Sequence, residues 1–176
     1  MPSCDITAGR KERCKNNVGG IKNVFFINYD GTLFSGATIT DEVITALAGA
    51  VDAYKYEVRG ANGFDEENNN SRENGSSFWA GTGTIVLKKQ DSDTQKELKL
   101  LSYGRPHVLV EDYNGNFRLF GQEHGCEVQV NSTTGQAMGD LNGYNLTVSS
   151  QEREMAYYVD ASLVDNVAGF NVIEEA

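Results

Sequence analysis

Apolar and polar residues alternate along several short stretches of the chain, and this period of two is typical of half-buried β-strands. In residues 21–29, Val24 and Phe26 would share one face and Phe25 and Ile27 the other, so both faces of this strand are expected to be buried. Two further runs flank Asn114-Gly115, which is a strong hairpin signal. The expected strands cover residues 21–29, 53–59, 78–89, 107–113, 116–121, 126–130, 144–148 and 156–159.

Two short helices are expected between these strands. The first would begin at Thr40 as N-cap, with Asp41 and Glu42 in its first turn. A strand competes with this interpretation because Ile39 and residues 43–45 are β-branched.

The second helix would run from Thr94 to about Ser102 and be capped by Ser92-Asp93. Leu98 and Leu101 would face the sheet, with Leu100 a further candidate, and Gly104 would end the helix.

Residues 59–77 carry five asparagines and three glycines, show no apolar period, and therefore predict a long polar loop between two strands. Connections longer than about 12–15 residues are usually functional or disordered, so we expect this loop to make contacts. Phe64 is its one large apolar residue, and an acidic cluster that follows would seek basic partners. The expected contact residues are Phe64, Asp65, Glu66, Glu67, Arg72 and Glu73.

The pattern as a whole predicts a mainly β protein, an antiparallel β-sandwich or barrel with one or two short helices and a long inter-strand loop. Residues 21–176 would form a single domain, preceded by an extended N-terminal arm at residues 1–20. The arm is basic, unlike the rest of the chain, and should dock on an acidic surface of the same or a neighbouring subunit. Its expected contact residues are Arg10, Lys11, Arg13 and Lys15.

The net charge changes what such a domain is expected to bind. The chain has a formal charge of −10 and an isoelectric point near 4.6. Nucleic-acid affinity depends on lysine and arginine neutralising phosphates, so nucleic-acid binding is disfavoured. An acidic surface that lets DNA pass without adhesion remains compatible with this charge.

The odd number of cysteines (Cys4, Cys14 and Cys126) and an N-terminus without an apolar signal segment indicate an intracellular, reduced protein. No stretch approaches the roughly 18 apolar residues of a membrane span, so no membrane association is expected.

Candidate catalytic signatures are weak. Residues 25–34 resemble the nucleophile segment of haloacid-dehalogenase-type phosphatases, but Asn28 stands where the nucleophilic aspartate is needed, and an amide cannot form an aspartyl phosphate. Gly81-Thr82-Gly83-Thr84 lacks the lysine and helix of a phosphate loop, and glycines within a strand more often mark a bulge or a close backbone approach. His107 and His124 have no partner at metal-ligand spacing. We therefore expect no catalytic, cofactor or metal site and no enzyme.

Two regions together resemble one family. The first contains Cys4-Asp5-Ile6-Thr7, Gly9-Arg10, Cys14-Lys15 and Val18-Gly19-Gly20-Ile21-Lys22, followed by Phe26, Asn28 and Tyr29. The second contains Thr133-Thr134-Gly135, Ala137, Gly139-Asp140-Leu141-Asn142-Gly143-Tyr144 and Leu146-Thr147-Val148, then Glu152 and Ala156. These residues resemble tail-tube and tail-ring structural proteins of tailed bacteriophages, notably those that infect Bacteroidota. Met155 departs from the proline expected before the last strand.

The resemblance implies a virion protein that is assembled in the host cytoplasm and acts by self-assembly. It implies a ring, usually of six copies, formed by sheet extension, stacked with neighbouring tail proteins around a channel through which DNA passes. The loop at residues 59–77 would then contact the next ring, with Phe64 as its anchor and Asp65, Glu66 and Glu67 paired with basic groups such as those of the N-terminal arm. The alternatives are a connector or terminator ring of the tail, or a carbohydrate-binding sandwich module using Phe78, Trp79 and Tyr113. An enzyme would depend first on Asp30 and His107.

Overall fold

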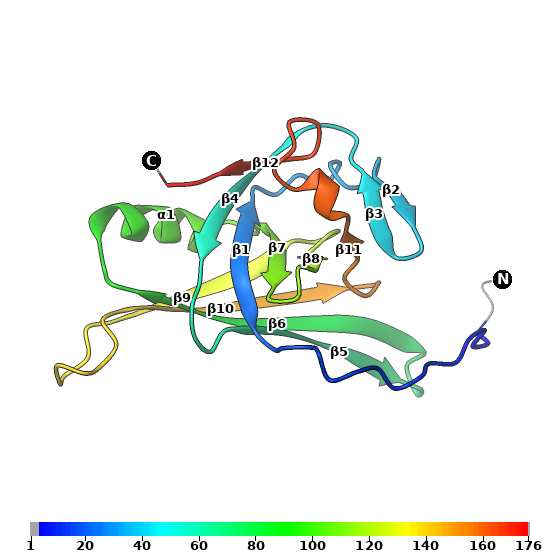
Figure 1. Ribbon diagram of the computed structural model, residues 1–176, viewed down its shortest axis with the longest axis horizontal. Helices are drawn as coiled ribbons and strands as arrows, with labels where there is room; N and C mark the ends of the chain where they lie inside the picture. Colours follow the sequence, from blue (N-terminus) through cyan, green and yellow to red (C-terminus); the bar gives the residue numbers. More distant parts are fainter. Residues whose placement is uncertain (1–3, 176) are drawn as a thin grey trace.

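The computed structural model describes residues 4–175, which form a mainly β protein with two sheets and one short α-helix (Figure 1). The strands are β1 (Ile21–Ile27), β2 (Thr38–Thr40), β3 (Val43–Ala46), β4 (Val51–Glu57), β5 (Gly63–Ser71), β6 (Ser76–Lys88), β7 (His107–Asp112), β8 (Phe117–Phe120), β9 (Cys126–Thr133), β10 (Gly143–Glu152), β11 (Tyr158–Val159) and β12 (Phe170–Ile173). The helices are α1 (Ser92–Tyr103) and the 3₁₀ turn η1 (Ala161–Leu163).

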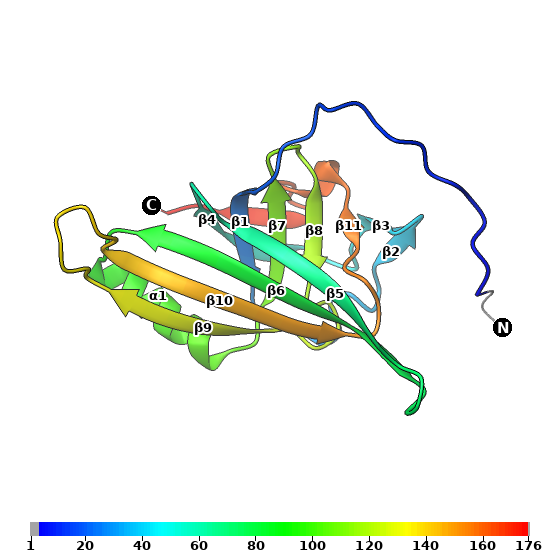
Figure 2. The same cartoon turned by 90° about the horizontal axis from the view of Figure 1, so that it is seen from below.

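The two sheets pack face to face. The larger has eight strands in the order β12-β4-β1-β7-β8-β11-β3-β2, and the smaller has four in the order β5-β6-β10-β9. Figure 1 shows the four-stranded sheet as a long layer beneath the larger sheet, and Figure 2, viewed from below, shows it in front. The predicted sandwich is confirmed and the barrel is not, since the sheets do not close. The larger sheet is also mixed, because β11 runs parallel to β3 and β12 parallel to β4.

β1 lies inside the larger sheet and contributes to both of its faces, as the sequence predicts. Val24 and Phe26 belong to the apolar core between the two sheets. Phe25 and Ile27 belong to a second core on the opposite face, which β12, η1 and the β2–β3 region help to cover. All four side chains are almost fully buried.

The predicted polar loop at 59–77 is wrong, because most of it forms β5 and the first half of a hairpin with β6. The two strands pair without a bulge from Gly63–Thr84 to Ser71–Ser76. The apolar period is missing because Glu66 and Asn68 occupy inward positions beyond Phe64, where their partners are polar groups of the neighbouring elements.

The predicted helix after Thr40 is also wrong. Thr40 pairs with Val43, and the two residues between them close the tight hairpin of β2 and β3. Asp41 and Glu42 have φ angles of 49° and 64°, the left-handed values that such two-residue turns require. The competing interpretation as a strand, which rested on β-branched residues, is confirmed.

Helix α1 confirms the second predicted helix, with its cap one residue earlier than expected. The Asp91 carboxylate accepts a 2.7 Å hydrogen bond from the Thr94 N–H and a second from its hydroxyl. Leu98 is buried in the core between the sheets, whereas Leu100 is 60% exposed. The β7–β8 hairpin around Asn114-Gly115 and the strands β9 and β10 are confirmed as well.

Candidate assembly interface

The first surface that could receive a partner is the N-terminal arm, residues 4–20, which precedes β1 in an extended form. Its side chains are exposed throughout, and both views show it leaving the two sheets (Figures 1 and 2). Near the end of the arm, Val18 exchanges two backbone hydrogen bonds with the Asn114 side chain. Ile6, a large apolar residue, is 97% exposed. A chain segment in this state has its apolar and charged groups available to another molecule.

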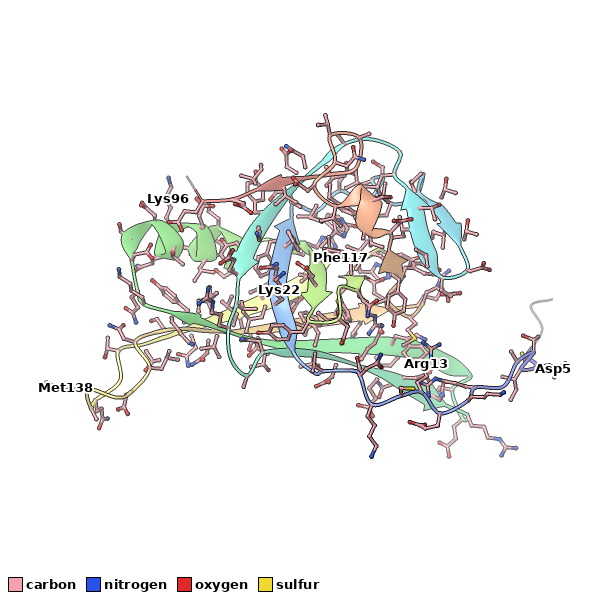
Figure 3. All side chains as sticks on the ribbon, in the orientation of Figure 1. Asp5, Arg13, Lys22, Lys96, Phe117 and Met138 are labelled. Atoms are coloured by element: carbon pink, nitrogen blue, oxygen red, sulfur yellow. The ribbon has the colours of Figure 1, made fainter. Side chains whose placement is uncertain are left out.

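The arm and the body have opposite charge. Residues 1–20 carry four cationic and two acidic side chains, so the remaining 156 residues carry a net charge of −12. None of Arg10, Lys11, Arg13 and Lys15 forms an ion pair with another residue of the described chain. Figure 3 shows Arg13 on the arm, clear of the larger sheet.

The second surface consists of the two edges of the four-stranded sheet. β5 (nine residues) and β9 (eight residues) each have a strand partner on one side only within residues 4–175. Neighbouring strands of this sheet are all antiparallel, so β5 and β9 run in opposite directions. Unpaired edges are templates for strands of another chain.

The outer face of the four-stranded sheet is polar. Paired residues of neighbouring strands share a face, and one such row reads Asp65, Thr82, Ser149 and Glu127, all exposed. Hydroxyl and amide residues occupy most other outward positions. The charged residues at outward positions of these strands are Asp65, Glu67, Glu127 and Lys88. This face is weakly acidic and offers little apolar surface.

The residues predicted to contact a neighbouring ring lie in three different environments. Phe64 points inward, where its ring stacks on Phe120 with centroids 4.3 Å apart, across the Cα of Gly83. Asp65 and Glu67 are exposed on the outer face, and Arg72 and Glu73 lie exposed in the β5–β6 turn. Of the six residues, only Arg72 and Glu73 lie at the tip of the β5–β6 hairpin.

Glu66 is held within its own subunit. Its carboxylate forms a 2.7 Å ion pair with Arg118 of β8 and accepts a 2.9 Å hydrogen bond from the Ala156 N–H. The side chain is 5% exposed, and the Arg118 guanidinium also bonds the Ala156 carbonyl. This network, which we call the Glu66 latch, joins the edge strand β5 to the larger sheet. It uses the acid that was expected to pair with the arm.

A second projecting turn, between β9 and β10, was not singled out as a contact by sequence reasoning. Met138 at its tip is fully exposed, and Figure 3 shows it at the far end of the molecule. The turn is internally fixed because the Asp140 carboxylate accepts hydrogen bonds from the N–H groups of Gln136 and Ala137, which also holds the pKa of Asp140 below its usual range. A rigid turn with an exposed apolar residue is a typical contact element, and the Asp-Leu-Asn-Gly sequence was the available signal.

The candidate catalytic residues are used in packing and backbone hydrogen bonds. His107 is fully buried, with Nδ1 bonded to the Gly121 carbonyl and Nε2 accepting from the Asp30 N–H. Burial lowers the pKa of His107, so the ring is neutral near pH 7. Hydrogen bonds from the Thr32 N–H and hydroxyl lower the pKa of Asp30. The three cysteines are free, and burial raises the pKa of Cys126 to about 12. A neutral buried imidazole and a buried thiol are poorly placed to act on a substrate.

The aromatic residues of the carbohydrate alternative do not share a surface. Phe78 and Trp79 are consecutive in β6 and therefore point to opposite faces of the sheet. Tyr113 lies in the β7–β8 turn, with its ring close to Gly20, the residue before β1. A stacking platform needs neighbouring rings on one face, and these three do not provide it.

Two findings complete the description of the chain. Among residues 4–175, no helix is both long and apolar enough to span a membrane. Comparisons with protein-family models, with curated proteins and with solved structures gave no match.

Proposed function

We propose that this chain is a structural subunit of a bacteriophage tail that self-assembles into rings or a tube through which DNA passes. The observation that carries the proposal is the four-stranded antiparallel sheet, which has two edge strands of nearly equal length, each with a strand partner on one side only, and a polar outer face. The resemblance of the N-terminal and β9–β10 segments to tail-tube proteins supports the same class.

The two edges suit head-to-tail pairing between copies. In a cyclic ring every copy has the same orientation, so β9 of one copy would meet β5 of the next. Because these strands run in opposite directions, the new pair is antiparallel like the rest of the sheet. Six copies would close a barrel with more strands than the roughly 16–18 at which natural barrels leave an aqueous channel.

The outer face of the four-stranded sheet would then line the channel, since the opposite face is occupied by the core between the sheets. Asp65, Glu67 and Glu127 would repel phosphates, while the hydroxyl and amide residues between them remain hydrated. Such a wall lets DNA slide without adhesion. This assigns Asp65 and Glu67 to the channel, in place of the contact with the next ring expected from sequence.

The arm and the two projecting turns would contact neighbouring rings and other tail proteins. The arm's cationic residues have no acidic partner among residues 4–175, and the body of each copy is strongly acidic. Docking the arm on a neighbouring copy therefore brings opposite charges together. Deleting residues 4–15 should leave the sheets folded and prevent stable stacking.

Negative-stain electron microscopy and light scattering of the purified chain over a concentration series test the proposal. Rings or tubes support it, and a monomer at every concentration, with known tail proteins of the same virion also added, contradicts it. Stacked particles indicate a tube, and single layers indicate a connector or terminator ring.

Two neighbouring proline variants test the edge itself. Successive residues of β5 direct their N–H groups alternately to β6 and outward, so one of Glu67→Pro and Asn68→Pro removes an inner hydrogen bond and the other an outward donor. The variant that keeps its unfolding midpoint should fail to form rings. Normal rings from that variant would exclude pairing through β5.

The channel assignment has its own test. Replacing Asp65, Glu67 and Glu127 by lysine should make assembled particles retain double-stranded DNA at low salt and release it at high salt. The matched control makes the same charge change at three exposed acids outside this sheet: Glu97, Glu154 and Glu175. Equal DNA retention by the two triple variants would refute the assignment.

A further inference from the structure

The connection between β8 and β9, residues 121–125, forms a tight turn against the end of β10. The Gly125 N–H donates to the Gly121 carbonyl, and Gly121 and Gly125 have φ angles of 70° and 76°. The Glu152 carboxylate of β10 accepts hydrogen bonds at Oε1 from the N–H groups of Glu123 (3.2 Å) and His124 (2.9 Å). The turn is therefore built on a single buried carboxylate.

Three possible metal ligands meet at this place. A carboxylate oxygen of Glu123, an imidazole nitrogen of His124 and a carboxylate oxygen of Glu152 all lie within 4.8 Å of one another. His124 Nε2 is 3.8 Å from Glu123 Oε2, and both of these side chains are exposed to solvent. Glu152 is thus buried and held by hydrogen bonds, whereas the exposed side chains of Glu123 and His124 can turn to bind an ion.

Two acceptor oxygens, one on the turn and one at the end of β10, lack a hydrogen-bond partner among residues 4–175. Glu152 is 5% exposed, and its second oxygen, Oε2, is buried without a hydrogen bond. Gln122 is also buried, and its Oε1 has no partner either. Burying an acceptor without a partner is unfavourable, and one of these two belongs to a potential ligand of the cluster. This shortage of donors is the observation that favours a cation over a solvated acidic group.

We propose that Glu123, His124 and Glu152 bind one divalent cation of the zinc class. Imidazole nitrogen and carboxylate oxygen are established zinc ligands, and zinc sites with three protein ligands complete their coordination with water. Two carboxylates give the site two negative charges, which match the charge of the ion. This inference concerns the isolated subunit and does not depend on the proposed assembly.

The position of the site indicates what the ion does. The chain passes from the larger sheet to the smaller one between β8 and β9, and it returns after β10. Glu123 and His124 lie on the first passage, and Glu152 immediately precedes the second. A bound cation would tie both passages together and stabilise the sandwich at that corner.

Zinc titration of the full chain by calorimetry tests the proposal, after chelator treatment and in a background in which Cys4 and Cys14 are serine. This background removes the two exposed thiols, which would bind zinc on their own. We expect one ion per chain with a dissociation constant at or below the micromolar range, and a higher thermal midpoint with zinc.

His124→Ala and Glu123→Gln should each weaken binding at least tenfold and abolish the zinc-dependent thermal shift. Both side chains are exposed, so these variants should fold, and Glu127→Gln is the matched control that should bind normally. Absence of binding below millimolar zinc overturns the proposal. Binding that is unchanged in both variants also overturns it, because the ion then lies elsewhere.

Discussion

The contact between Phe64 and Gly83 allows two hypotheses for Phe64 to be distinguished by mutation. Phe64 is either a core residue of its own subunit or an anchor for the next ring. In the structure the ring is half-buried, stacks on Phe120 and covers Gly83. Replacing a fully buried phenylalanine by alanine reduces the free energy of unfolding by about 3–5 kcal/mol, and the loss is smaller for a partly exposed ring. We expect Phe64→Ala to reduce the free energy of unfolding by about 2–3 kcal/mol, including the stacking contribution of about 1 kcal/mol.

Gly83→Ala tests the same contact, because its effect on the free energy of unfolding should depend on whether Phe64 is present. A methyl group at Gly83 would overlap the Phe64 ring, and such overpacking costs about 1–3 kcal/mol. In the Phe64→Ala background the overlap is absent, and alanine is favoured over glycine in a strand by about 0.5–1 kcal/mol. The cost of Gly83→Ala should therefore vanish or reverse in the double variant.

Urea unfolding followed by circular dichroism, at concentrations where the chain is monomeric, measures all four species of this cycle. Phe78→Ala is the matched control, since Phe78 lies on the neighbouring strand β6, on the face opposite to Gly83, and is partly exposed. Additive costs for the two substitutions would refute the predicted contact. A Phe64→Ala variant with normal stability and no assembly would restore the ring-anchor role.

Three further perturbations have expected outcomes. Burial lowers the pKa of His107 below its usual 6.5, so as the pH falls through 6.5 the unfolded chain takes up a proton at this residue before the folded chain does. The contribution of the neutral, buried His107 to the free energy of unfolding is therefore complete above about pH 6.5 and declines below it. Urea midpoints between pH 7.5 and 5.5 should therefore fall less in His107→Gln than in the unchanged chain, and equal slopes would contradict this. Glu66→Ala should cost about 3 kcal/mol by leaving Arg118 without its partner, and less than an additive amount when combined with Arg118→Ala; a cost below about 1 kcal/mol would make the latch an ordinary surface pair. Asp41→Asn with Glu42→Gly should stabilise the chain by about 0.5–2 kcal/mol, because these residues suit the left-handed turn, and a lower thermal midpoint would argue against that turn.

Sequence patterns predicted those strands and helices in which the spacing of apolar residues matches the residues that are buried. The alternation in β1 and β9 reflects one or two buried faces, and the cap before Thr94 reflects local hydrogen bonding at a helix start. β5 was missed because its inward residue Glu66 is neutralised by Arg118, which lies 52 positions away. β12 was missed for a related reason, since its place depends on parallel pairing with the distant strand β4.

The candidate sites were less predictable than the fold because they depend on juxtaposition. Asp41 and Glu42 fit the first turn of a helix as well as they fit charged turn residues, and only the pairing of Thr40 with Val43 decides between them. His124 has no ligand at a recognisable spacing, because Glu152 is 28 positions further along the chain. The β6 glycines leave room for neighbouring side chains, because a Cβ at Gly81 would meet the Ser150 hydroxyl and one at Gly83 would meet the Phe64 ring. The nearest atoms belong to side chains and the pairing has no bulge, so neither outcome expected from the sequence is found there.

The similar lengths of β5 and β9 also bear on how ring assembly would depend on the concentration of subunits. A single junction between two edge strands is only marginally stable in water, so a pair of copies should separate readily. The last copy to enter a ring forms two junctions at once, and the second is an intramolecular event at high effective concentration. Partial rings would therefore be scarce, and assembly would have a sharp concentration threshold that a preformed template in the virion could lower.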